Sequence, residues 1–356
     1  MKIFGDIKEK MKSLYADGAA KMQICMLGAR GVGKTSVLTS MFHDINRANS
    51  DTELMLTTCT DETFTREVIL EKHRLLKDAF HCADDSLIMK DAGIAGDFSV
   101  STYHFQFGLK GKKDRIDLHI RDYPGEYVIT EPEKVKAYIR ESNAVIVAID
   151  APHLMEEGGA FNEVKNRVSE ITAFFNNAFE GLNEDKLILL VPLKCEKYYR
   201  EGQLDALTKK VEEVYAPLLE FFANGEIKKH IVCAITPILT MGEVVFDSFE
   251  RESDGSIKLI HDEQEGDLPV ARYRFTSANA VYRPKYCEQP LCYLLSFVVK
   301  LYYRTKDQQV GVLRKFLNLF KLFPDDPSLL MEIDRFGTRK VVGKDGYKIV
   351  QGNRKV

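Results

Sequence analysis

A glycine-rich stretch near the amino terminus contains the first residues whose types and spacing could do chemistry. Residues 28–35 read GARGVGKT and fit G-x-x-x-x-G-K-[ST] at each fixed position, directly after the apolar run 22–27. Glycines let a loop wrap so tightly that successive backbone N–H groups face phosphate oxygens, and a following helix adds partial positive charge. The pattern therefore predicts a phosphate-binding loop between a buried strand and a helix from about Lys34 to Phe42.

Side chains of this loop have separate expected roles. Lys34 should reach the terminal phosphates, and the hydroxyl of Thr35 should ligate Mg²⁺. Arg30 is a candidate arginine finger that would neutralise developing charge, although a side chain that points into solvent or pairs with another segment is the plainer interpretation. The residues expected to contact the nucleotide here are Gly28, Ala29, Arg30, Gly31, Val32, Gly33, Lys34, Thr35 and Ser36.

A second motif, RDYPGE at residues 121–126, follows an alternating strand. Asp122 ends that strand and can hold Mg²⁺ directly or through water, while the N–H of Gly125 can bind the γ-phosphate until hydrolysis removes it. The carboxylate of Glu126 could accept a hydrogen bond from an attacking water, but its charge near the γ-phosphate predicts slow hydrolysis without help. The candidate catalytic residues are Lys34, Glu126, Arg30 and Gly125, and the candidate metal ligands are Thr35 and Asp122.

Together, GARGVGKT and DYPGE resemble the GTPases of the translation-factor-related (TRAFAC) P-loop class. Residues 101–109 and 114–122 alternate around the turn GKKD and predict an antiparallel hairpin. Such GTPases place one antiparallel strand beside the strand that bears the magnesium ligand. Within the class, residues 22–304 resemble the bacterial double-GTPase group of conflict and defence systems. The resemblance implies GTP or GDP as ligand, Mg²⁺ as cofactor and a switch that acts on a protein partner.

The motif that would read the base departs from the pattern of these GTPases. They recognise guanine with [NT]-K-x-D after a strand, whereas residues 193–196 here read LKCE. Lys194 could pack over the base and Glu196 could accept two hydrogen bonds from guanine, or both charges could simply face solvent. Leu193 offers no polar contact. A site that lacks such contacts should discriminate less between bases.

Two further parts of the expected site remain open. The last base-contact loop is expected at Thr236, because ligands collect at the carboxyl ends of parallel strands, with Ser277-Ala278 as the alternative. The hydroxyl that closes over Mg²⁺ should precede the strand near residue 101. The candidates by position are Ser99, Ser101 and Thr102, with Thr57, Thr58 and Thr60 as earlier alternatives.

The order of apolar strands and amphipathic helices predicts an α/β fold of the P-loop NTPase type. We expect a mostly parallel sheet with one antiparallel strand, helices on both faces and a small α+β extension at the carboxyl end. The expected divisions are an amphipathic helix over 1–20, a GTPase domain over 21–305 with a polar, acidic insertion at about 241–272, and a helical and hairpin extension over 306–356.

Composition limits the functional classes. The chain has 356 residues and a net charge of −3, so it lacks the basic excess typical of nucleic-acid binders. Seven scattered cysteines without a C-x-x-C pair indicate a reduced, cytoplasmic protein, and no apolar run is long enough for a transmembrane helix.

These features leave more than one function open. We expect slow hydrolysis of GTP, with a non-hydrolysing, nucleotide-gated scaffold or an ATPase that uses the same phosphate site as alternatives. The candidate partner surfaces are the switch loops, the insertion at 241–272 and the basic tail, and a homodimer is a further option.

Overall fold

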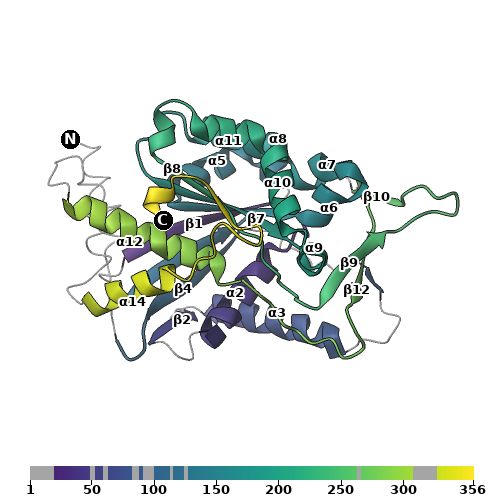
Figure 1. The fold of residues 1–356 in the computed structure, drawn as a ribbon, viewed down its shortest axis with the longest axis horizontal. Coiled ribbons are helices and arrows are strands. Elements are labelled where there is room, and N and C mark those ends of the chain that lie inside the picture. Colours follow the sequence, from purple (N-terminus) through teal and green to yellow (C-terminus); the bar gives the residue numbers. More distant parts are fainter. Residues whose placement is uncertain are drawn as a thin grey trace.

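The computed structural model describes residues 20–48, 53–58, 63–81, 88–90, 100–112, 115–123, 127–262, 266–307 and 327–356 (Figure 1). The predicted amino-terminal helix, apart from its last residue, lies outside this set. So do Ser99, Thr60, Gly125 and Glu126.

An eight-stranded sheet forms the centre of the molecule, in the order β13-β8-β7-β6-β1-β5-β4-β2. Its strands are β1 (Ala20–Leu27), β2 (Leu54–Thr58), β4 (Ser101–Leu109), β5 (Arg115–Asp122), β6 (Ala144–Asp150), β7 (Lys186–Leu193), β8 (Ile231–Ile235) and β13 (Lys348–Gln351). Strands β8, β7, β6, β1 and β5 are parallel to one another. The predicted hairpin is confirmed as the antiparallel pair β4–β5. The predicted mostly parallel sheet is confirmed, and the carboxyl-terminal extension adds a further antiparallel strand to it, because β13 pairs with β8.

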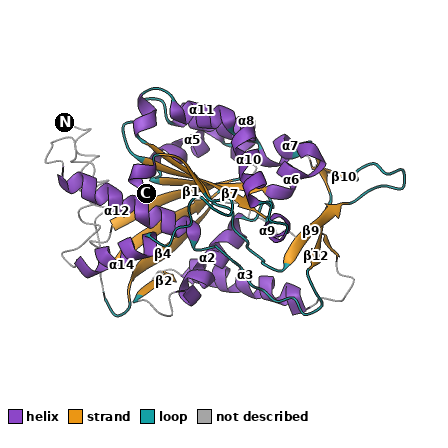
Figure 2. Cartoon of the chain, viewed as in Figure 1, coloured by secondary structure: helices purple, strands orange, loops and turns teal. Residues whose placement is uncertain are grey.

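Helices cover both faces of this sheet, as predicted (Figure 2). One face packs against α2 (Lys34–Ala48), α3 (Thr63–His81), α12 (Gln289–Asp307) and α14 (Pro327–Gly337). The other packs against α5 (Pro132–Glu141), α6 (Ala151–Met155), α8 (Val168–Ala178), α10 (Leu204–Val214) and α11 (Ala216–Ala223). Shorter elements are α4 (Tyr127–Thr130), η1 (Glu156–Gly159), α7 (Asn162–Asn166), α9 (Glu196–Arg200), η2 (Glu226–Lys229) and η4 (Asn353–Lys355). No helix in the described part of the chain is both long and apolar enough to cross a membrane.

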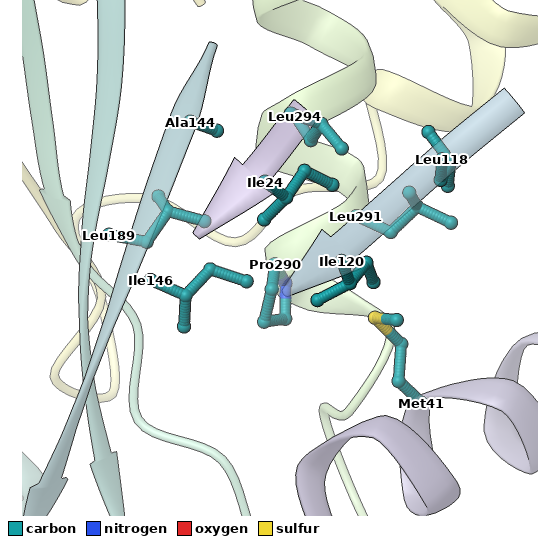
Figure 3. A pocket seen from close by; sticks show the side chains of 10 residues that line it. All are labelled: Ile24, Met41, Leu118, Ile120, Ala144, Ile146, Leu189, Pro290, Leu291 and Leu294. Atoms are coloured by element: carbon teal, nitrogen blue, oxygen red, sulfur yellow. The ribbon is translucent and has the colours of Figure 1, made fainter. Parts of the chain in front are cut away.

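A small pocket lies between the sheet and the helices α2 and α12 (Figure 3). It is lined by Ile24, Met41, Leu118, Ile120, Ala144, Ile146, Leu189, Pro290, Leu291 and Leu294. These side chains carry no group that could bind a phosphate, so the pocket is a packing gap in the core between two layers. The cysteines in the described ranges are likewise buried and free, at positions 25, 195, 233, 287 and 292.

The predicted insertion region, 241–272, contains most of a second, three-stranded sheet. This sheet has the order β3-β12-β9 and combines β9 (Val244–Phe249) and β12 (Ala271–Phe275) with β3 (Ile88–Lys90), which precedes β4 in the chain. A hairpin of β10 (Leu259–Asp262) and β11 (Gly266–Pro269) extends from it. Figure 1 shows this sheet next to α9, on the side of the molecule away from the carboxyl terminus. Phe80 of α3 belongs to its apolar cluster, so the insertion packs on the segment that leads to β4.

The end of the chain completes the edge of the main sheet. After a turn at Asp345 and Gly346, β13 pairs with β8. Tyr347 is 1% exposed, and its hydroxyl donates to the carbonyl of Pro237 over 2.6 Å. The carboxyl-terminal strand therefore supports the loop that follows β8, at the carboxyl end of the parallel strands.

Replacing Tyr347 tests this docking. We expect Tyr347→Ala to lower the free energy of unfolding by about 3–5 kcal/mol because it empties a buried aromatic site. Tyr347→Phe should cost about 1 kcal/mol, because only the hydrogen bond is lost. Urea unfolding measures both, with Val342→Ala, at an exposed position, as the control. If Tyr347→Ala unfolds within about 0.5 kcal/mol of the wild type, as surface changes do, the strand is not part of the cooperative fold.

Candidate functional site

The loop between β1 and α2 has the strand–loop–helix geometry that the sequence predicts. Its three glycines all have positive φ angles, from 68° at Gly31 to 147° at Gly28. A Cβ on Gly28 would lie 2.9 Å from the carbonyl oxygen of Ala148, so only glycine lets the loop start this close to β6.

Lys34 begins α2, and its side chain folds back into the phosphate loop. Its ammonium donates to the carbonyl of Gly28 over 2.9 Å and to that of Ala29 over 3.1 Å, and the residue is only 9% exposed. The positive charge of Lys34 is therefore held within the loop, where the motif requires it.

Asp122 lies at the same corner, although it is 87 residues from Thr35 in the chain. Strand β1 pairs with β5 so that Met26 is opposite Asp122, which places the carboxylate beside the start of the loop. The hydroxyl of Thr35 donates to Oδ2 of Asp122 over 3.4 Å, and Nζ of Lys34 is 3.9 Å from Oδ1. The structure thus brings together the two predicted metal ligands and the predicted phosphate lysine.

This corner has the donor chemistry that suits a magnesium ion. Hydroxyl and carboxylate oxygens are hard ligands, and neighbouring ligands of an octahedral Mg²⁺ at about 2.1 Å lie about 3 Å apart. The described residues hold no cluster of three or more His, Cys, Asp or Glu side chains that could bind a metal unaided. Because Mg²⁺ usually takes one or two protein ligands together with water and phosphate oxygens, these two residues fit an ion that arrives with a nucleotide.

The candidate switch hydroxyls are spread over two strands. Ser101 is opposite Asp122 in the β4–β5 pair, and Thr102 follows it. Thr57 instead lies on the outer strand β2, where its hydroxyl donates to the carbonyl of Gln106. Thr58 is its neighbour on that strand. Ser101 is therefore the described candidate that is paired with the proposed metal ligand.

The residues of the degenerate base motif bind other parts of the protein. Glu196 is buried and its carboxylate accepts hydrogen bonds from the N–H groups of Met241, at 2.9 Å, and Gly242, at 3.2 Å. Lys194 adopts a left-handed conformation with φ 56° and forms an ion pair of 2.9 Å with Asp150. Both side chains are thus held by protein groups near the ends of β6 and β8, rather than facing solvent.

The two candidates for the last base-contact loop differ in how deeply they are buried. Thr236 is fully buried, and its backbone N–H donates to the carbonyl of Leu190 as an extension of β8. Ser277 and Ala278 are exposed in a turn after β12. The hydroxyl of Thr236 is buried and has no hydrogen-bond partner among the residues that the structure describes.

Sequence analysis missed Asp150, at the end of β6. Its carboxylate is fully buried between His153, 2.6 Å away, and Lys194. Burial by itself raises the pKa of Asp150, but His153 and Lys194 outweigh it and hold that pKa well below the ordinary 3.8. The sequence does show an aspartate at the end of an apolar strand, but it does not show that Lys194 lies beside this carboxylate.

Two more residues near the site were also missed. Tyr273, on β12, places its ring 5.5 Å from the ammonium of Lys194. Lys165, on α7, donates from Nζ to the carbonyl of Arg30 over 2.7 Å. Nothing in the local sequence pattern distinguishes either residue from an ordinary core tyrosine or surface lysine, because each acts across a long-range contact.

The loop, its lysine and the strand order define a P-loop NTPase domain of the GTPase type. Residues 23–229, more than half of the chain, match the family Double-GTPase 2. The chain belongs to that family, which confirms the resemblance to double-GTPases. No curated protein matches the chain.

Solved structures with a similar arrangement are distant in sequence. The Ski7 GTPase-like domain of S. cerevisiae, bound to GTP, is 12% identical with a TM-score of 0.40, and the match covers 64% of this chain and 44% of that one. Methanosarcina barkeri Roco2 RocCORdC bound to GDP is 12% identical with a TM-score of 0.29, over 62% and 44%. Sup35 complexed with GDP is 10% identical with a TM-score of 0.29, over 62% and 38%. The chain thus spans less than half of the length of each.

The buried carboxyl of Glu196 leads to a prediction about pH. Burial raises its pKa above the ordinary 4.5, although the N–H groups of Met241 and Gly242 oppose this. Above pH 4.5 the folded chain therefore holds this proton more tightly than the unfolded chain, so its contribution to stability falls as the pH rises through the raised value. Glu196→Gln keeps an acceptor oxygen and removes the titration. We expect the free energy of unfolding of Glu196→Gln to rise relative to the wild type between pH 5 and pH 8.

Chemical denaturation across that pH range measures the difference. Glu213→Gln, at a half-exposed side chain on α10, is the control and should follow the wild type at each pH. A difference between Glu196→Gln and the wild type that stays constant with pH, or that shrinks as the pH rises, would contradict the burial argument.

Proposed function

We propose that this chain is a magnesium-dependent GTP-binding protein that hydrolyses GTP slowly and acts as a switch for a protein partner. The observation that carries the proposal is the meeting of Lys34, Thr35 and Asp122 at one corner of the sheet, where the Thr35 hydroxyl lies 3.4 Å and the Lys34 ammonium 3.9 Å from the carboxylate of Asp122. Membership of the Double-GTPase 2 family supports it.

The phosphates would bind in the loop of residues 28–35. Its backbone N–H groups and the amino end of α2 supply partial positive charge, and Lys34 supplies a full charge. The ammonium now binds two carbonyls of the same loop, so a phosphate oxygen would replace those acceptors without moving the lysine out of the site. Thr35 and Asp122 would hold the Mg²⁺ that accompanies the nucleotide and neutralises the charge of the phosphates.

Hydrolysis is assigned to residues outside the described ranges together with the loop. Gly125 would bind the γ-phosphate, and Glu126 would position the attacking water. Phosphoryl transfer to water depends on positioning and charge neutralisation, and a carboxylate beside the γ-phosphate adds negative charge. We therefore propose a slow basal rate. Arg30 remains a candidate for a cation that lowers the barrier.

The contacts of Glu196 and Lys194 leave open whether the site prefers guanine or adenine. Glu196 would recognise guanine only if it exchanged the N–H groups of Met241 and Gly242 for the base. Lys194 would likewise have to leave or share Asp150. These contacts favour weaker discrimination than an [NT]-K-x-D motif gives, so an ATPase that uses the same phosphate site is the second candidate. Competition of ATP against a fluorescent GTP analogue distinguishes the two.

The switch function would pass through loops that change with the γ-phosphate. The insertion at 241–272 contacts the site through Met241 and Gly242 and is the proposed partner surface, with the carboxyl-terminal tail as another. The resemblance to double-GTPases suggests a prokaryotic defence setting in the cytoplasm. A nucleotide-gated scaffold that does not hydrolyse GTP is an alternative that single-turnover phosphate release distinguishes. A homodimer is a further hypothesis.

Removing the phosphate lysine tests the binding site. Lys34→Ala should weaken GTP and GDP binding by about 10- to 100-fold, because it removes hydrogen bonds from a charged group. Fluorescent nucleotide titration measures this. Binding of Lys34→Ala within twofold of the wild type would contradict the proposed phosphate site.

Magnesium dependence tests Asp122 and Thr35. We expect Mg²⁺ to tighten GTP binding by the wild type about 10-fold or more, and Asp122→Asn and Thr35→Ala to lose this response, because each removes a hard oxygen ligand. Asp117→Asn is the control, since Asp117 lies on the same strand and pairs with Gln106. The same response to Mg²⁺ in all four proteins would refute the metal site, and single-turnover phosphate release separates a GTPase from a scaffold.

A further inference from the structure

A lysine from outside the motifs contacts the phosphate loop. Lys165 is only 5% exposed, and its Nζ donates to the carbonyl of Arg30 over 2.7 Å. The same Nζ is 3.7 Å from the position that a Cβ would occupy on Gly31. The ammonium thus lies against the peptide unit that joins Arg30 to Gly31. Burying a charge is costly unless it is paired or hydrogen-bonded, and here the carbonyl of Arg30 supplies a hydrogen bond.

The helix that carries Lys165 is fixed to the end of β6. The side chain of Asn166 accepts from the N–H of Asp150 over 2.7 Å and donates to its carbonyl over 3.1 Å. It also donates to Oδ1 of Asn162, at the start of the same helix. These buried hydrogen bonds attach α7 to the strand beside the phosphate loop. Lys165 therefore lies on an element that is fixed to the sheet.

The peptide geometry gives this contact a direction. In a trans peptide unit the C=O of one residue and the N–H of the next point in opposite directions. The carbonyl of Arg30 faces Lys165, so the N–H of Gly31 faces away from Lys165. The φ angle of 68° at Gly31 is one that glycine adopts without strain. Backbone N–H groups of this loop are the groups that bind phosphate oxygens.

We propose that Lys165 is a positioning residue of the phosphate site. Its ammonium holds the Arg30 carbonyl outward, so that the N–H of Gly31 is aimed at the phosphates and polarised as a donor. A cation on the carbonyl of a peptide unit draws electron density from its N–H and strengthens the hydrogen bond that the N–H makes. The inference deepens the proposed function and rests on it. Helix α7 would thus orient a peptide unit of the phosphate loop that no side chain of the motif at residues 28–35 is proposed to orient.

A second buried lysine provides the comparison. Lys186 is 1% exposed and donates to the carbonyls of Arg140 and Ser142, at 2.9 and 2.8 Å. It begins β7, so it lies at the opposite end of the parallel strands from the phosphate loop. Replacing Lys186 removes two hydrogen bonds to carbonyls and replacing Lys165 removes one, so both changes should lower stability. Only the change at Lys165 should alter the phosphate site.

The test compares Lys165→Met, Lys165→Arg and Lys186→Met. Fluorescent GTP and GDP titrations give the affinities, and ¹⁵N–¹H correlation spectra follow the Gly31 amide with and without Mg²⁺·GDP. Lys165→Met should weaken both nucleotides by about 3- to 10-fold, because the N–H of Gly31 is then no longer held toward the phosphates and one hydrogen bond is weakened or lost, and it should shift the Gly31 amide. Lys165→Arg should restore most of the affinity. Lys186→Met should lower the unfolding midpoint and leave the affinity and the Gly31 amide as in the wild type.

The outcomes separate this inference from the proposed function. If the wild type binds nucleotide and Lys165→Met binds it with unchanged affinity, the role of Lys165 alone is overturned, whether or not the Gly31 amide shifts. If the wild type bound neither nucleotide, the proposed function would fail, and the Gly31 amide of the nucleotide-free proteins would still decide the orientation. If Lys165→Met does not fold, the ¹⁵Nζ resonance of Lys165 in the wild type decides: it should shift when Mg²⁺·GDP binds, and a constant resonance would overturn the inference.

Discussion

The pairing of β1 with β5 sets the geometry on which the rest of the site depends. Met26 is opposite Asp122 in this pair, which brings the carboxylate to Thr35 and Lys34. Successive side chains of a strand point to opposite faces, so a slip of one residue in this register would turn Asp122 away from the loop. Strand β5 alternates between buried apolar residues on one face and half-buried polar residues on the other, so such a slip would move its apolar side chains out of the core. The hydrophobic core thus fixes the position of two oxygens that could share a metal ion.

Much of this arrangement could be predicted from the sequence because the signals are local. The motif at residues 28–35 contains its own loop, lysine and hydroxyl, and the β4–β5 hairpin follows from alternation around a short turn. Asp122 reaches Thr35 because β1 and β5 are adjacent, parallel strands whose carboxyl ends lie side by side. Strand β13 lies in the extension that was expected to form a hairpin, but its pairing with β8 was not predicted, because a four-residue strand shows no sign of which edge it will join.

The surroundings of the base motif could not be predicted, since they depend on contacts between distant segments. Glu196 binds backbone N–H groups that follow β8, and Lys194 is held by Asp150 and lies near Tyr273 of the inserted sheet. That sheet also includes β3, which precedes the strand of Ser101 in the chain. The second sheet and the residues before it therefore contact both the base motif and the segment that leads to β4. A sequence pattern gives the residue types here but not their partners.

The most direct measurement is a crystal structure of the chain with Mg²⁺ and a non-hydrolysable analogue of GTP. We expect a triphosphate enclosed by the backbone of residues 28–35. We also expect a magnesium ion bonded to the hydroxyl of Thr35 and held by Asp122, directly or through one water. Phosphates located outside that loop, or an ion that contacts neither side chain, would contradict the central claim.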